Sequence, residues 1–212
     1  MKKTTILAVL VILVGFIISI YYYPQMPERV ASHWNAKGEV NGYMGKFWGI
    51  FLMPIVSIGM LLLFLAIPII DPLKKNIEKF RKYYDGFVVL MMIFFLFIQT
   101  SIIFANLGYK FNISNIIIPA VALIFIYLGF ILDKIKRNWF MGIRTPWTIS
   151  NDKVWEETHK LGSKLFKIAG LIILVSIFFQ EYMIWFILIS VLLAALIPVV
   201  YSYFLWKKLK KK

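Results

Sequence analysis

Six long runs of apolar residues divide this chain, and each is long enough to cross a lipid bilayer. A hydrocarbon core about 30 Å thick requires about 20 helical residues. Because backbone groups inside lipid must be hydrogen-bonded within the protein, such runs fold as helices. The runs are residues 4–23, 47–70, 86–107, 115–132, 161–179 and 182–205. The sequence therefore predicts an all-α integral membrane protein built as a six-transmembrane helix bundle.

The composition agrees with a membrane protein and excludes several kinds of site. Hydrophobic residues make up 61% of the 212 residues and charged residues only 16%, which is unusual for a soluble domain. The chain has no cysteine, so it can form neither a disulfide nor a thiolate metal or redox site. The first run is longer than the apolar core of a signal peptide, and we expect it to be retained as a span.

The distribution of Lys and Arg predicts the orientation. The two termini, the second connection and residues 133–167, which include Lys164 and Lys167 at the start of the fifth run, hold 20 of these residues, and the other three connections hold 4. Since basic loops stay in the cytoplasm, we expect both termini inside the cell (N-in/C-in) and the protein in the plasma membrane. This placement explains the net charge of +14 without direct nucleic-acid binding. It also brings the basic tail against anionic membrane lipid.

These assignments divide the chain into consecutive segments. No ionisable residue lies in the central part of a span, where Gln99 is the most polar residue, and this counts against an ion-coupled transporter. The segments are an N-terminal domain at 1–70 with an outer loop at 24–46, a basic cytoplasmic loop at 71–85, spans three and four at 86–132, a cytoplasmic signature loop with an amphipathic helix at 133–160, spans five and six at 161–205, and a basic cytoplasmic tail at 206–212.

The outer loop is expected to be compact and ordered. Its Asn41-Gly42 pair suits a tight type I′ turn. His33 lies at its polar centre and has two interpretations: it bonds loop backbone and supports the turns, or it contacts a ligand. A metal site that combines His33 with Glu28 or Glu39 has too few ligands for zinc, and we expect neither a metal nor another cofactor.

The inner loop is expected to end in an amphipathic helix. Ser150 or Asn151 can cap the helix N-terminus, and Trp155 and His159 then lie four residues apart on one face. We expect this helix at the inner membrane interface, continuing into the fifth span. It serves either as an interfacial anchor or as a docking surface for a cytosolic partner.

A lone arginine precedes this helix in a rigid turn between Gly142 and Pro146. Arg144 can bond helix carbonyls or lipid phosphate, or it can pair with a partner carboxylate.

The two loops together resemble the SdpI-type immunity proteins and the N-terminal domain of unknown function that accompanies them. One departure is Asn41, because the family often has Asp at this position. The outer motif consists of Met26-Pro27, His33-Trp34-Asn35, Gly38, Asn41-Gly42-Tyr43 and Lys46, and the inner motif of Gly142-Ile143-Arg144-Thr145-Pro146, Thr148, Asn151, Trp155 and His159.

The resemblance implies a membrane immunity protein, not an enzyme, which gives resistance to a secreted membrane-active peptide toxin. In the best-known member this role is coupled to signalling, in which a small cytosolic transcriptional repressor is sequestered at the membrane. By position, the toxin-facing residues would be His33, Trp34, Asn35, Gly38 and Gly42, and the cytoplasmic partner-facing residues would be Gly142, Arg144, Thr145, Pro146, Trp155 and His159.

Two other functions remain open at this point. A small-solute permease is suggested only by prolines inside the second, fourth and sixth spans. A membrane enzyme would have to use His33 on the outer face.

Overall fold

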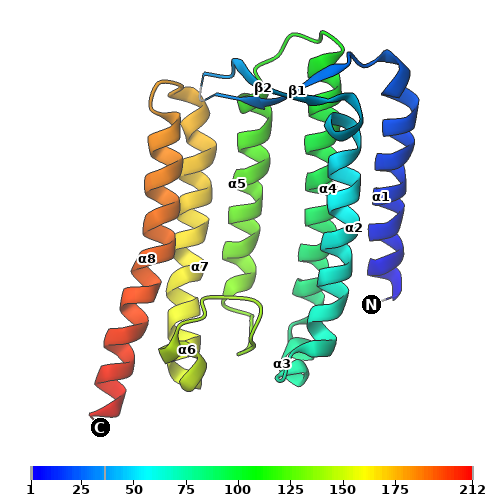
Figure 1. Cartoon of the computed structure of the whole chain (residues 1–212). Coiled ribbons are helices and arrows are strands. Elements are labelled where there is room, and N and C mark those ends of the chain that lie inside the picture. Colours follow the sequence, from blue (N-terminus) through cyan, green and yellow to red (C-terminus); the bar gives the residue numbers. More distant parts are fainter. Residues whose placement is uncertain (1, 36, 212) are drawn as a thin grey trace. The chain divides into compact units, whose positions relative to one another are not determined.

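The computed structural model describes residues 2–35 and 37–211, and most of them are helical (Figure 1). Six helices in this part of the chain are long and apolar enough to cross a membrane, which confirms the expected spans. They are α1 (Lys2–Tyr22), α2 (Lys46–Ile70), α4 (Arg81–Asn106), α5 (Ile113–Leu132), α7 (Asp152–Val175) and α8 (Met183–Lys210). The short helices are η1 (Tyr23–Gln25), α3 (Lys74–Lys79), α6 (Pro146–Ser150) and η2 (Ser176–Phe178).

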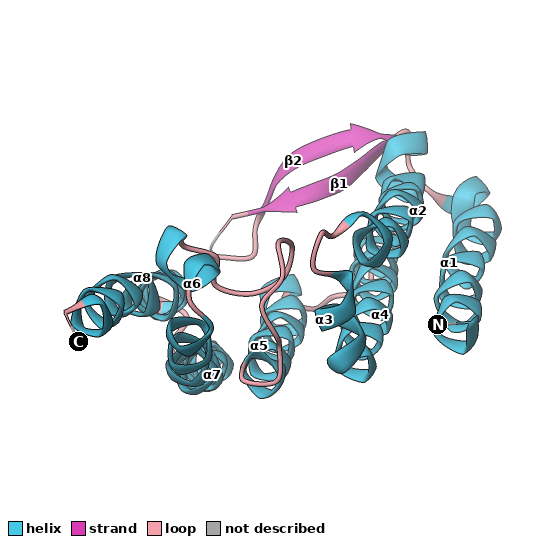
Figure 2. Cartoon of the chain, turned by 90° about the horizontal axis from the view of Figure 1, so that it is seen from below, coloured by secondary structure: helices cyan, strands magenta, loops and turns pink. Residues whose placement is uncertain are grey.

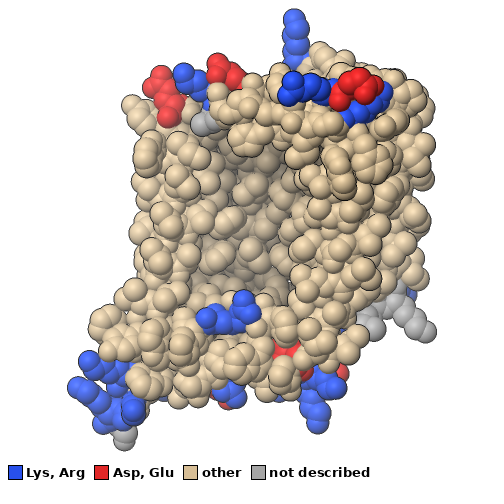
Figure 3. All heavy atoms as spheres, viewed as in Figure 1, with Lys and Arg blue, Asp and Glu red and all other residues tan. Residues whose placement is uncertain are grey.

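The helices form two compact units. The first unit contains Met1–Leu65 and Asp85–Ala120, and the second contains Ala66–Tyr84 and Val121–Lys212. On the face that Figure 3 shows, most charged side chains lie towards the two ends of the helices. An exception in the sequence of α7 is the pair Lys164 and Lys167, which lie inside the helix, and long basic side chains of this kind can extend towards the membrane interface.

The outer loop is a β-hairpin, so the all-α expectation is wrong for this segment. β1 (Arg29–Trp34) pairs antiparallel with β2 (Val40–Gly45) in a two-stranded sheet. In Figure 2 the strands lie side by side, with β1 nearer to the helices of the first unit. In β1, Arg29 is exposed and the adjacent Val30 and Ala31 are both buried, and the pairing with β2 becomes irregular after Ala31, as at a β-bulge.

The hairpin turn lies elsewhere than expected. Asn41 and Gly42 belong to β2, where Gly42 lies opposite His33, so the predicted Asn-Gly turn is wrong. The chain instead reverses between Asn35 and Glu39, whose main chains are joined by a bond from Asn35 N to Glu39 O of 2.9 Å. The Asn35 side chain accepts from Lys37 N and Glu39 N at 2.9 and 3.0 Å. An asparagine that bonds its own following backbone is a strong turn former.

Gln99 joins three helices of the first unit. Its Nε2 donates to the Gly15 carbonyl at 2.8 Å and to Ser19 Oγ at 2.6 Å on α1. The Ser19 hydroxyl donates in turn to the Ile50 carbonyl of α2 at 3.1 Å. Since Gln99 is 2% exposed, the most polar residue at mid-span is a helix-packing residue.

We expect Gln99→Leu to destabilise the protein by about 1 kcal/mol, because hydrogen bonds between membrane helices contribute on this order. The measurement is unfolding by SDS titration in mixed micelles. Thr100→Val is the matched control, since the Thr100 hydroxyl donates only within its own helix, to Leu96 O and Phe97 O, each at 3.0 Å. Equal losses in the two variants would show that the Gln99 bonds do not hold the helices together.

In the second unit, α7 begins and packs as an amphipathic helix. Asn151 caps it, because its Oδ1 accepts from Lys153 N at 2.9 Å and Val154 N at 3.1 Å, which confirms the expected helix start. The helix then runs without a break to Val175. Ser163 donates to the Gly129 carbonyl of α5 at 2.7 Å, a close approach that small residues allow in membrane helices.

Candidate functional site

The signature loop, residues 133–151, is folded around one buried asparagine. Asn138 is fully buried. Its Oδ1 accepts from Phe140 N at 2.9 Å and from Met141 N at 2.6 Å. Its Nδ2 donates to the carbonyls of Lys136 and Met141, both at 2.9 Å. The side chain thus provides hydrogen-bond partners for backbone groups of the loop that are partly buried.

Asp71, directly after α2, and Asn76 of α3 hold this loop in place. Asp71, 2% exposed, accepts from Trp139 N at 2.9 Å and from Leu73 N at 2.6 Å. Asn76 Nδ2 donates to the Arg137 carbonyl at 2.8 Å. Sequence reasoning missed Asn138, Asp71 and Asn76, because one polar residue in a polar segment carries no periodic signal.

His159 joins α7 to the signature loop. Its Nδ1 lies 2.8 Å from the Trp155 carbonyl, and its Nε2 accepts from Ile143 N at 3.0 Å. A carbonyl can only accept and a backbone N–H can only donate, so both bonds require a neutral ring with its proton on Nδ1. The Trp155 ring stacks on the imidazole at a centroid distance of 4.0 Å, and its Nε1 donates to the Ile135 carbonyl at 2.8 Å.

Gly142 lies against this histidine. Its φ of +112° is in the region that side chains other than glycine rarely adopt. A Cβ at this position would overlap His159 Nε2 and would lie 3.3 Å from Trp155 Cζ2. Both the backbone angle and the lack of space therefore require glycine here.

The start of α6 fastens the loop to α8. Thr145 and Thr148 form a capping box, with bonds of 2.8 Å from Thr145 N to Thr148 Oγ1 and 3.1 Å from Thr148 N to Thr145 Oγ1. The Thr145 hydroxyl also lies 3.0 Å from Ser202 Oγ of α8. Sequence analysis did not expect α6, since five residues are too few to show helical periodicity.

The six residues assigned to the cytoplasmic partner do not form one surface. Trp155 and His159 are each 1% exposed and Thr145 is 7% exposed, so they hold the loop from inside the second unit, as Gly142 does. Arg144 and Pro146 are exposed. Arg144 Nη1 donates to the carbonyl of Trp139, whose own side chain is 48% exposed.

The hairpin is fastened to the first unit by Asn106 of α4. Asn106 Oδ1 accepts from Ala31 N at 2.7 Å, and Asn106 Nδ2 donates to the Ala31 carbonyl at 3.0 Å. Val30, fully buried, packs in a cluster with Ile50 of α2 and Ile103 of α4. These contacts fix β1 on the helices.

The five residues assigned to the toxin have different places on this hairpin. His33 is exposed, and its Nδ1 lies 2.5 Å from Asn41 Oδ1. Asn35 and Gly38 build the turn, where Gly38 has φ +79°, and Gly42 lies opposite His33. The described residues contain no group of three or more His, Cys, Asp or Glu arranged to hold a metal ion.

His33 and Trp34 line a cavity of about 310 Å³ beneath β1, here named the hairpin cavity. Its walls also include Met53 of α2, two isoleucines of α4 and four residues at the start of α5. A cavity of this size lies at the lower end of the range for ligand pockets, which are commonly found between bundled helices.

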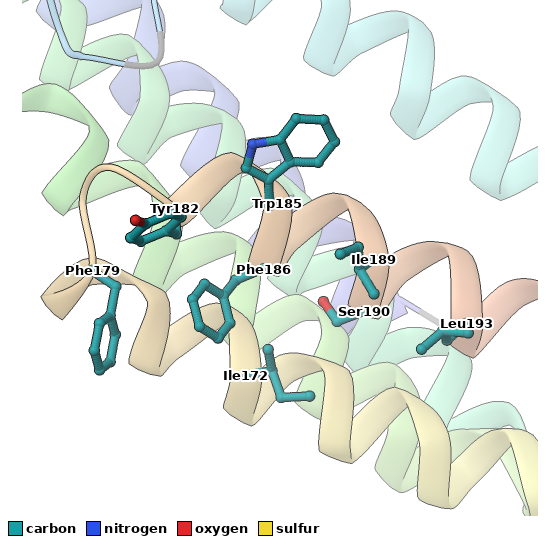
Figure 4. A pocket seen from close by; sticks show the side chains of 8 residues that line it. All are labelled: Ile172, Phe179, Tyr182, Trp185, Phe186, Ile189, Ser190 and Leu193. Atoms are coloured by element: carbon teal, nitrogen blue, oxygen red, sulfur yellow. The ribbon is translucent and has the colours of Figure 1, made fainter.

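A second cavity of about 520 Å³, the α7–α8 cavity, lies in the second unit (Figure 4). Aromatic side chains lie at one end of it and aliphatic ones along its length; they are Phe179, Tyr182, Trp185 and Phe186, with Ile172, Ile189, Ser190 and Leu193. The Ser190 hydroxyl donates to the Ile187 carbonyl at 3.1 Å, so the lining is almost wholly apolar.

Comparison with known proteins finds matches for the part of the chain that contains the hairpin and for the part that contains the signature loop. The model of the SdpI/YfhL protein family matches residues 134–202. The model described as "Domain of unknown function (DUF1648)" matches residues 10–58. The chain is 30% identical over 208 residues to the Immunity protein SdpI of Bacillus subtilis (strain 168), with 98% of each chain covered. No solved structure matches the chain.

Proposed function

This chain belongs to the SdpI/YfhL protein family, and we propose that it is an immunity protein that protects its cell from a secreted, membrane-active peptide toxin. It is a multi-pass protein of the cell membrane. The observation that carries the proposal is the similarity to the Bacillus subtilis immunity protein over 98% of both chains. The comparisons give no support to the permease alternative.

The test is survival of cells that lack this gene and carry either the wild-type chain or an empty vector. The probes are the apolar peptide fractions of culture medium from the source organism and from Bacillus subtilis strain 168. We expect the wild-type chain to raise the tolerated concentration of at least one fraction about tenfold. Equal sensitivity of the two strains to both fractions would refute the proposal.

The proposed orientation places both termini and the signature loop inside the cell and the hairpin outside. The distribution of basic residues supports it, because 20 of the 24 Lys and Arg then lie on the cytoplasmic side, counting Lys164 and Lys167 in the first part of the fifth span. The hairpin residues His33 and Trp34 would contact the toxin. Asn35, Gly38 and Gly42 would maintain the shape of the hairpin that presents them.

Cysteine labelling checks the orientation, since the chain has no native cysteine. Position 36, the first choice from the sequence, lies outside the described residues; Lys37 and Lys153 are both exposed. In intact cells, a membrane-impermeant thiol reagent is expected to label Lys37→Cys and not Lys153→Cys. Permeabilised cells, in which both should react, are the control. The reverse pattern in intact cells would invert the orientation.

A signalling role for the signature loop is the second part of the proposal. Arg144, Pro146 and Trp139 present the exposed side chains that a small cytosolic repressor could contact, and the buried residues would hold them in place. The test is cross-linking from Lys153→Cys in native membranes with and without the peptide fraction. Capture of a small DNA-binding protein only with peptide supports this role, and no capture under either condition refutes it.

A further inference from the structure

The hairpin cavity extends from the hairpin towards membrane depth. Its apolar walls, Met53, Ile98, Ile102, Ile117 and Ile118, belong to α2, α4 and α5, which are candidate spans. Its roof is β1, which lies beyond the ends of these spans. A ligand that fills this cavity therefore needs an apolar group between the helices and a polar group next to β1.

The roof carries hydrogen-bonding groups. Ser32 and His33 come from β1 and Ser114 comes from the first turn of α5. His33 Nδ1 is already bonded to Asn41. Within the described part of the chain, the hydroxyls of Ser32 and Ser114 have no hydrogen-bond partner. Each hydroxyl can donate one hydrogen bond and accept others, and a peptide backbone offers both kinds of partner.

The α7–α8 cavity provides a contrast. It is larger, about 520 Å³ against about 310 Å³, and its only hydroxyl besides Tyr182 is that of Ser190, which bonds its own helix. Many side chains of α8 around it are exposed, including Ile189 at 53% and Leu193 at 50%. Such a surface suits lipid acyl chains, which need no hydrogen bonds. The free hydroxyls of the hairpin cavity instead suit a ligand with amides.

We propose that the hairpin cavity receives a bulky apolar side chain of the peptide toxin while Ser32 and Ser114 bond the peptide backbone at its mouth. This inference rests on the proposed immunity function and names the place and mode of toxin binding. Trp34 adds an aromatic wall, and aromatic side chains contribute strongly to binding where they become fully desolvated.

The direct test is photo-crosslinking with benzoylphenylalanine at Ile117, in the full chain in native membranes. The probe is the peptide fraction against which the wild-type chain protects. Benzoylphenylalanine at Leu193, in the α7–α8 cavity, is the matched control. A peptide adduct at Ile117 and not at Leu193 supports the inference. Lipid adducts alone at Ile117, no adduct, or the same peptide adduct at both positions overturns it.

A functional test uses variants that block the cavity or remove its polar groups. Ile117→Trp should abolish the protection, whereas Leu193→Trp should leave it unchanged. Ser32→Ala combined with Ser114→Ala should lower the tolerated concentration of the peptide fraction about tenfold. This is the effect expected from the loss of two neutral hydrogen bonds of ordinary strength. SDS titration checks that Ile117→Trp unfolds at nearly the same SDS concentration as the wild type. If Ile117→Trp is unfolded, the double serine variant tests the inference instead.

The outcomes separate this inference from the proposed function. If the wild-type chain protects and Ile117→Trp and the double serine variant protect equally well, the cavity is not the toxin site and the immunity function stands. If the wild-type chain does not protect against either fraction, the immunity function itself fails.

Discussion

Asn138→Ala is expected to unfold the signature loop and to destabilise the second unit by about 3–5 kcal/mol. The substitution leaves four part-buried backbone groups without their partner, the N–H groups of Phe140 and Met141 and the carbonyls of Lys136 and Met141. An unsatisfied buried polar group costs about 1–3 kcal/mol, although relaxation and water entry recover part of this. The measurement is unfolding by SDS titration in mixed micelles.

The control for this prediction is Asn76→Ala in the same unit, which removes one bond to the Arg137 carbonyl and one exposed bond from Lys79 Nζ. Its expected cost is about 1 kcal/mol. Partner capture at the signature loop should fall with Asn138→Ala, because the loop that carries Arg144 loses its shape. If Asn138→Ala costs no more than Asn76→Ala, the loop does not depend on Asn138 for its fold.

The spans could be predicted from sequence because their cause is local. Twenty uncharged apolar residues in a row have one stable arrangement in lipid, and the observed helix α2 starts within one residue of the expected run. The hairpin could not be predicted in the same way. The backbone of Ala31 is hydrogen-bonded to the side chain of Asn106, a residue 75 positions away. No local sequence pattern indicates such a distant partner.

The signature residues show the same limit. Helical spacing correctly places Trp155 and His159 on one face of α7, and Asn151 at its start. Spacing does not reveal what covers that face, and lipid, a partner or the chain itself were all compatible with it. The structure shows that the signature loop covers it, through the bond from Ile143 N to His159. Two exposed residues, Arg144 and Pro146, are then left for contact with another molecule.

Gly142→Ala is expected to destabilise the second unit by about 3 kcal/mol. Positive φ costs a residue with a side chain about 1–2 kcal/mol, and overpacking against His159 adds about 1–3 kcal/mol. Only the second contribution depends on the imidazole. In the double variant Gly142→Ala with His159→Ala the new methyl group has space, so the combined loss should be smaller than the sum of the two single losses.

The double-mutant cycle therefore separates the two reasons for glycine at position 142. SDS titration of the wild type, both single variants and the double variant is expected to give a coupling of about 1 kcal/mol or more. Gly162→Ala combined with His159→Ala is the control pair, because a Cβ at Gly162 would contact Ile143 and Leu132 and not the imidazole. Additive losses for Gly142 and His159 would mean that backbone conformation alone requires this glycine. A combined loss smaller than the sum of the two single losses would establish that His159 and the signature loop pack as one element. Only then can a partner contact at Arg144 depend on α7.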